Sequence, residues 1–338
     1  MKYIKRFIAA ITSLVMLSVV CACSQTNNNS STTTTESPTY SAPLKVVATI
    51  NQWGSLAQEI GGSLVSVTSI MTNTNVEAHD YEPQASDVSK LEKADVVVIN
   101  GAGYDAWATK NISNETLKVS AASIVGAATG DNPHLWFSKD ARAAVAKELA
   151  NTFSKALPKK KQTFEKNLKA WEKTEATLDE SIQEIRSKHK NISYAATESI
   201  AYYLMSDLGF TNVTPKGYEQ AVASEAETSA SDLQDFTTLL EARKANILIN
   251  NAQETSDATN TITGVAHRSD IPVVDLTEQM PSEYKTVNDW ISAIIKSISD
   301  ALDANQNSNT DSDNQSDNSS QDSESQIPSN EGQTDPGK

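Results

Sequence analysis

The segment LKVVATI at residues 44–50 begins an alternation of β-rich runs and helical patterns. Two further β-rich runs are LVSVTSI at 64–70 and DVVVIN at 95–100, and helical patterns at 55–60 and 84–93 separate the three runs. Short strands that alternate with helices are typical of open α/β sheets with parallel strands. We therefore expect residues 43–161 to form an α/β lobe.

The same alternation returns after residue 188. The expected strands lie at 192–196, 246–250 and 272–275, and the expected helices at 200–208, 230–243 and 258–267. These elements predict a second α/β lobe over residues 189–302. The region 43–302 is long enough to give each lobe its own apolar core.

One long helix is expected between the lobes. Apolar side chains at spacings of three, four and seven form a single stripe along residues 162–188: Phe164, Leu168, Trp171, Leu178, Ile182 and Ile185. A stripe of this kind indicates an amphipathic helix, and at ~1.5 Å per residue it would be about 40 Å long. We expect it to be a rigid spine that joins the lobes and restricts hinge motion.

Residues 1–22 are typical of a secretory signal, because cationic residues precede an apolar run that is short for a permanent membrane span. The run ends in VCAC at 20–23, which resembles the lipobox of bacterial lipoproteins. The resemblance implies cleavage before Cys23 and acylation of Cys23, and two or three acyl chains anchor a protein stably to a bilayer. An ordinary cleaved signal followed by an accidental cysteine is the alternative.

Two polar segments flank the region that is expected to fold. Residues 23–42 begin with the lipidated cysteine and lack an apolar period, so we expect them to form a flexible tether. Residues 303–338 are rich in Asn, Ser, Asp and Gln, and we expect a disordered acidic tail that acts as a spacer.

Composition and charge exclude two classes of function. The 338 residues include 28 Lys and Arg against 43 Asp and Glu, a formal net charge of −15. A nucleic-acid-binding protein needs a basic face, and no basic patch interleaved with aromatic residues is visible. Of the two cysteines, we expect Cys21 to leave with the signal and Cys23 to be lipidated, so the mature domain has neither a free thiol nor a disulfide. The second excluded class is therefore any function that depends on cysteine chemistry.

The four histidines differ in their sequence contexts. His189 and His267 lie at the ends of expected helices beside basic residues, and we interpret both as surface caps. His79 lies in VEAHDYEP, between an expected strand and an expected helix, and the carboxyl ends of strands are where open α/β sheets bind ligands. His134 lies in the turn DNPHLWF.

Four motifs resemble those of the metal-specific substrate-binding proteins of bacterial ABC importers, the family that captures zinc or manganese outside the cell. The motifs are H-x-YEP at 79–83, NPH-x-W at 132–136, TES at 197–199 and LTEQM at 276–280. The resemblance covers nearly all of 43–302. It implies two open α/β lobes with mostly parallel sheets, joined by one long rigid helix, with a metal ion held between the lobes.

Carried over to this chain, the resemblance implies two metal ligands from each lobe. They are His79 and His134 from the first lobe, and Glu198 and Glu278 from the second. Glu278 stands where an aspartate is usual, and Asp275, three residues earlier, is the alternative fourth ligand.

The implied ligand set favours Mn²⁺, with Zn²⁺ next. Zinc-type members usually have a third histidine at the position of Glu198, whereas manganese-type members have a glutamate there, as this chain does. Zinc-type members also often carry a loop rich in His and acidic residues, and none lies between His79 and His134. Each carboxylate can bind through both oxygens, so the site could reach five or six coordination. The preference is modest, because Mn²⁺ is the weakest binder in the divalent affinity order.

These observations predict an extracytoplasmic, monomeric lipoprotein that captures one divalent metal ion as cargo and delivers it to an ABC permease in the membrane. We expect no catalytic cofactor and no enzymatic activity. A secreted metallohydrolase is one alternative, but the chain has no His-Glu-x-x-His motif, no Gly-x-Ser-x-Gly motif and no Gly-rich phosphate loop. A surface adhesin or interaction lipoprotein is the other; the tether and tail permit it, but it does not explain the ligand set.

Overall fold

The computed structural model describes residues 40–74 and 81–318, with side chains described as far as residue 305. Within this part of the chain the first lobe contains a four-stranded sheet with the strand order β2-β1-β3-β4. Its strands are β1 (Leu44–Ile50), β2 (Val65–Met71), β3 (Val96–Ile99) and β4 (Leu117–Ser120), and all of them pair in parallel.

The second lobe repeats this topology with the order β6-β5-β7-β8, again entirely parallel. Its strands are β5 (Ser193–Ala196), β6 (Thr211–Asn212), β7 (Ile247–Asn251) and β8 (Val273–Leu276). The prediction of two parallel α/β lobes is confirmed. In each sheet the strand order reverses between the first and third strands, and such a switch point is where open α/β sheets bind ligands.

The helices of the first lobe are α1 (Asn51–Gly61), α2 (Ala85–Glu92), α3 (Ala106–Thr109), α4 (Ala121–Val125) and α5 (Lys139–Ala156). Short 3₁₀ turns lie at Gly62–Leu64, Leu135–Phe137 and Pro158–Lys160. Helix α1 begins four residues earlier than expected. Its first turn contains Asn51 and Gln52, which are polar but buried because they contact the second lobe.

The helices of the second lobe are α7 (Tyr202–Asp207), α8 (Lys216–Ala223), α9 (Ala230–Glu241) and α10 (Asp257–Arg268), and a 3₁₀ turn lies at Ser199–Ala201. Helices α9 and α10 each begin with a capping box, in which the serine at the N-cap accepts from the backbone three residues later. His267 is exposed in the last turn of α10, as predicted for a surface cap.

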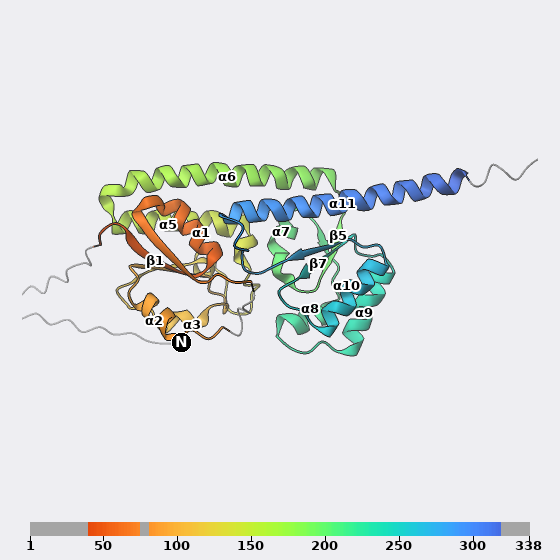
Figure 1. Cartoon of the computed structure of the whole chain (residues 1–338), viewed down its shortest axis with the longest axis horizontal. Coiled ribbons are helices and arrows are strands. Elements are labelled where there is room, and N and C mark those ends of the chain that lie inside the picture. The colour runs from red at the N-terminus through yellow and green to blue at the C-terminus, as the bar shows by residue number, and fades with distance from the viewer. Residues whose placement is uncertain (1–39, 75–80, 319–338) are drawn as a thin grey trace, which may run out of the picture. The chain divides into compact units, whose positions relative to one another are not determined.

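The connecting helix α6 spans Lys161–Lys188, in agreement with the predicted 162–188. The apolar stripe is buried at every position except Leu168, which is half-buried. Near its start Phe164 packs on Phe153 of α5, with ring centroids 5.5 Å apart, and farther along α6 packs beside α11 (Figure 1). The stripe thus predicted both the limits of the helix and its buried face.

The last helix corrects two predictions. Helix α11 spans Val287–Asn318, so helix replaces the expected disorder over 303–318. The regular backbone of the helix continues into the polar segment. Its first part contains seven buried apolar side chains: Val287, Trp290, Ile291, Ile294, Ile295, Ile298 and Leu302. His189 is the C-cap residue of α6, as expected for a helix end, but its side chain is buried and not on the surface. Its Nε2 lies 3.3 Å from Oδ1 of Asp303 on α11.

Both lobes belong to one compact unit, and a single cluster of buried apolar side chains includes residues of both sheets and of helices α1, α5, α6 and α11. Smaller clusters lie on the other face of each sheet. Among the residues that the structure describes, no helix is both long enough and apolar enough to cross a membrane.

Candidate metal centre

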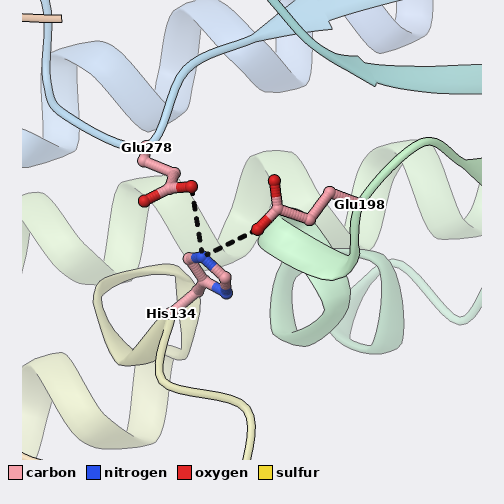
Figure 2. A group of neighbouring side chains, drawn as sticks. All are labelled: His134, Glu198 and Glu278. Carbon is pink, nitrogen blue, oxygen red and sulfur yellow. Dashed lines mark ion pairs between the residues drawn. The ribbon is translucent and has the colours of Figure 1, made fainter. Parts of the chain in front are cut away.

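Three side chains from separate elements converge between the lobes (Figure 2). Nε2 of His134 lies 3.7 Å from Oε1 of Glu198 and 3.9 Å from Oε1 of Glu278. One ligand atom from each residue lies within 4.8 Å of the other two. His134 and Glu278 are buried, and the Glu198 side chain is 12% exposed. An imidazole and two carboxylates gathered at this spacing can hold a divalent cation.

The turn that carries His134 orients its ring. The backbone N–H of His134 donates to Oδ1 of Asn132 at 3.0 Å, and Nδ1 of the ring lies 2.9 Å from the same oxygen. Because a carboxamide oxygen only accepts hydrogen bonds, Nδ1 carries a proton, and in the neutral ring the lone pair is then on Nε2, which faces the carboxylates. The network therefore assigns the tautomer that a metal ligand needs.

Asn100 fixes the same turn from the carboxyl end of β3. Its Nδ2 donates to the carbonyl of Pro133 at 2.8 Å, and its Oδ1 accepts from Nε1 of Trp53 at 3.0 Å. The turn that follows is tight: Gly101 has φ = 81°, and a Cβ there would meet Cβ of Ala122 at 2.7 Å. A glycine is thus required at this position.

Asp105 holds that turn together by accepting from the backbone N–H groups of Asn100 and Gly101 and from Oγ1 of Thr49, at 2.6, 2.8 and 2.6 Å. Burial raises the pKa of Asp105, and these hydrogen bonds act in the opposite direction. The turn in this conformation points Tyr104 at the second lobe.

Glu198 and Glu278 follow the carboxyl ends of β5 and β8, respectively. Oε2 of Glu198 accepts from Nδ2 of Asn251, the last residue of β7, at 2.6 Å. Oε2 of Glu278 accepts from the hydroxyl of Tyr104 at 2.8 Å, and the backbone N–H of Glu278 donates to Oε1 of Gln253 at 3.0 Å. In both carboxylates a hydrogen bond thus holds Oε2, and Oε1 faces His134.

Direct hydrogen bonds join the lobes around the site. Nδ2 of Asn51 donates to the carbonyl of Met280 at 2.5 Å, and Nε2 of Gln52 donates to the carbonyl of Glu278. On the other side, Nδ2 of Asn132 donates to the carbonyl of Ser199 at 2.7 Å. The two lobes are therefore closed on each other around these three side chains.

The electrostatics of the group favour a cation. Nε2 of His134 is buried and has no hydrogen-bond partner, and two carboxylates lie within 4 Å of it. Burying carboxylates without a compensating charge is costly. A divalent cation in contact with all three residues would use the nitrogen lone pair and offset both negative charges.

An acidic groove opens beside the group on the second lobe. It is a cavity of about 790 Å³, and its lining includes five acidic side chains, Glu198, Glu225, Glu227, Glu254 and Asp257. A groove lined by one sign of charge attracts ions of the opposite sign. Glu198 belongs both to this groove and to the candidate centre.

The structure brings together three of the four ligands expected from the sequence. The fourth, His79, lies outside the described residues, in the segment 75–80. Cys23 is also outside the described residues. Asp275, the alternative ligand, is exposed at the end of β8 and accepts from Nδ2 of Asn250 at 2.8 Å, so it does not belong to the group. The roles of Asn251 and Tyr104 were not foreseen; the one signal for Asn251 was its place directly after the predicted strand 246–250.

Comparison with known sequences identifies relatives over most of the chain. A family model described as zinc-uptake complex component A, periplasmic (ZnuA), matches residues 46–301. The zinc-binding lipoprotein AdcA of Streptococcus pneumoniae is 24% identical over 283 residues, which cover 75% of this chain and 54% of AdcA. The iron ABC transporter substrate-binding lipoprotein MtsA of Streptococcus pyogenes is 26% identical over 269 residues, which cover 72% of this chain and 81% of MtsA. This chain therefore spans about half the length of AdcA but most of MtsA.

Solved structures agree on the fold. The laminin-binding adhesin Lmb of Streptococcus agalactiae and the periplasmic zinc-binding protein TroA of Treponema pallidum each superpose with a TM-score of 0.65 at 19% identity, covering 77% of this chain and 99% of theirs. The sequence relatives are named as metal-binding and transport proteins and not as enzymes. Because the family model covers most of the chain, the protein belongs to the family of periplasmic zinc-uptake complex component A proteins.

Proposed function

We propose that this protein captures a divalent transition metal ion, Mn²⁺ or Zn²⁺, outside the cytoplasm and delivers it to an ABC permease. His134, Glu198 and Glu278 bind the ion together with His79, which the sequence motif contributes. Family membership and the names of the relatives AdcA and MtsA support a metal cargo and a permease partner. The protein acts as a monomer, is held at the membrane through acylated Cys23, and catalyses no reaction.

One observation carries the proposal: the buried, unpartnered Nε2 of His134 faces two carboxylates from the opposite lobe. A hydrogen-bonded structural histidine would have no need of two acids at this distance. A site for a permanent structural zinc would more often contain thiolates, and no cysteine occurs among residues 40–74 and 81–318. Ligands from two lobes suit an ion that must be bound and later released.

The experiment is metal binding by the full chain after treatment with a chelator. Calorimetric titration with Zn²⁺ and with Mn²⁺ should show one ion bound per chain. His134→Ala and His79→Ala should weaken binding at least tenfold, or about 1.4 kcal/mol. His267→Ala is the matched control, because this histidine is exposed on α10. Wild-type protein that binds neither ion would refute the proposal.

The membrane anchor has a separate test. Mature protein should carry acyl chains on Cys23 and sediment with membranes, and Cys23→Ala should release it or leave the signal uncleaved. Intact-mass analysis is the measurement. A mature N-terminus without any lipid mass would contradict the anchor without affecting the metal site.

A further inference from the structure

Hydrogen bonds to the two carboxylates limit how each can bind an ion. Oε2 of Glu198 is held by Nδ2 of Asn251 at 2.6 Å, and Oε2 of Glu278 is held by the Tyr104 hydroxyl at 2.8 Å. In both residues Oε1 is the oxygen that faces Nε2 of His134, at 3.7 and 3.9 Å. Each carboxylate therefore turns its Oε1 toward the centre, while its Oε2 accepts the hydrogen bond from Asn251 or Tyr104.

Both donors are themselves held in place. Asn251 is 1% exposed; its backbone N–H donates to Oγ1 of Thr197 at 2.9 Å, and its Oδ1 accepts from the backbone N–H of Gln253 at 3.0 Å. Tyr104 is 3% exposed, and its hydroxyl accepts from Nε2 of Gln279 at 2.8 Å. Since these acceptors are occupied, both donors are oriented toward the carboxylates.

Asn251 also links the two acids. The same Nδ2 lies 3.3 Å from Oε1 of Glu278, so one amide group contacts both carboxylates. A bidentate carboxylate must turn both oxygens toward the ion, and here that rotation would break the bond to Asn251 or to Tyr104. Breaking a hydrogen bond to a buried charged group is costly.

We propose that Asn251 and Tyr104 are positioning residues that set metal specificity, by restricting Glu198 and Glu278 to one ligand oxygen each. This inference rests on the metal-binding function proposed above. Three metal ligands that contribute one atom each, plus one further ligand, give four-coordination through nitrogen and oxygen atoms, which suits Zn²⁺. The sequence-based preference for Mn²⁺ assumed carboxylates that bind through both oxygens. The two hydrogen bonds reverse that preference.

The test compares Asn251→Ala and Tyr104→Phe with wild type in the full, metal-depleted chain. Competition titrations give the dissociation constants for Zn²⁺ and Mn²⁺, and their ratio reports specificity. Each substitution should shift that ratio toward Mn²⁺ at least tenfold, because the released oxygen can join the coordination sphere. Asn246→Ala and Tyr194→Phe are matched controls. Asn246 is exposed just before β7 and accepts from the backbone N–H of Ser193, and Tyr194 is a buried tyrosine in β5.

Cobalt supplies a readout of geometry that a purely structural role would not change. Co²⁺ absorbs visible light strongly when four-coordinate, less strongly when five-coordinate and weakly when six-coordinate. Wild type and both controls should give the strong spectrum, and the two variants should give a weaker one.

Equal weakening for both ions with an unchanged cobalt spectrum would overturn the proposal while leaving metal capture intact. A weak cobalt spectrum in wild type would overturn it too. Failure of wild type to bind any of the three ions would instead refute the proposed function itself, and this inference with it. If Asn251→Ala does not fold, Tyr104→Phe decides alone, since it removes one hydroxyl and keeps the ring.

Discussion

Glu59 on α1 is an acid in an unfavourable environment. Its Oε2 is buried without a hydrogen-bond partner. Burial, followed by the nearby charges of Asp289 and Glu175, raises the pKa of Glu59 to about 7. The folded-state pKa lies above the unfolded one, so the neutral acid favours folding. That contribution is complete below about pH 4.5 and is lost as the pH rises through about 7.

Glu59→Gln should therefore stabilise the protein at neutral and higher pH. We expect the free energy of unfolding at pH 8 to rise by roughly 1–3 kcal/mol, because one pKa unit corresponds to about 1.4 kcal/mol. The gain should disappear near pH 4.5. Urea denaturation of wild type and variant at both pH values measures it, with the exposed Glu180→Gln as control. An equal gain at both pH values would contradict the electrostatic explanation.

Three helices meet at one buried ion pair. Arg142 of α5 is fully buried, and its Nη2 lies 2.6 Å from Oε1 of Glu175 on α6. Oε2 of Glu175 accepts from Nδ2 of Asn288 on α11 at 2.8 Å, and Nη1 of Arg142 donates to the carbonyl of Trp136 at 2.9 Å. The pair thus links the connecting helix to the turn that carries His134.

Removing the acid of this pair should be strongly destabilising. Glu175→Ala leaves the Arg142 guanidinium buried without its counter-charge, a change that costs about 3–5 kcal/mol. The midpoint of urea denaturation measures the loss. Glu172→Ala, an exposed change on the same helix, should have little effect. A similar small effect from both substitutions would show that the buried pair does not stabilise the helix packing.

The extension of α11 past residue 302 contacts the rest of the protein through Asp303. Asp303 accepts from Lys188 at 2.5 Å and lies beside His189, so the helix is attached to the end of α6 up to this point. A chain that ends after Asn305 should keep these contacts and bind metal as the full chain does. Titration checks this. A tenfold loss of affinity, about 1.4 kcal/mol, would place the remaining segment in the binding function.

Local patterns predicted the elements best where one face is buried throughout. The stripe of α6 is the clearest case, whereas β4 buries only Val119 and β6 is two residues long with no buried side chain, so neither gave a signal. Helix α8, which buries only Tyr218, was missed for the same reason. Periodicity also could not show that the polar start of α1 is buried against the other lobe.

Site prediction depended on motifs more than on patterns. His134, Glu198 and Glu278 were recognised because they lie in motifs that resemble a family. Tyr104 and Asn251 lie outside those motifs. Tyr104 meets Glu278 across 174 positions of sequence, and such a contact follows from the packing of the two lobes, which no local pattern encodes.

In the proposed function, a metal ion joins the two lobes. The shared core and helices α6 and α11 already hold the lobes together, and the interlobe hydrogen bonds of Asn51 and Gln52 add to this. An ion bound by His134 from one lobe and by Glu198 and Glu278 from the other would add a further link. Because the three ligands come together only in the folded chain, such an ion would stabilise that chain by mass action.

The most direct test is the thermal unfolding of the metal-depleted chain as Zn²⁺ or Mn²⁺ is added. At a free concentration 100 times the dissociation constant, an ion should add about 2.7 kcal/mol to the free energy of unfolding and raise the melting temperature accordingly. His134→Ala and Glu278→Gln should lose most of this shift, and His267→Ala should keep it. A full shift in His134→Ala would contradict an ion held between the lobes by these residues.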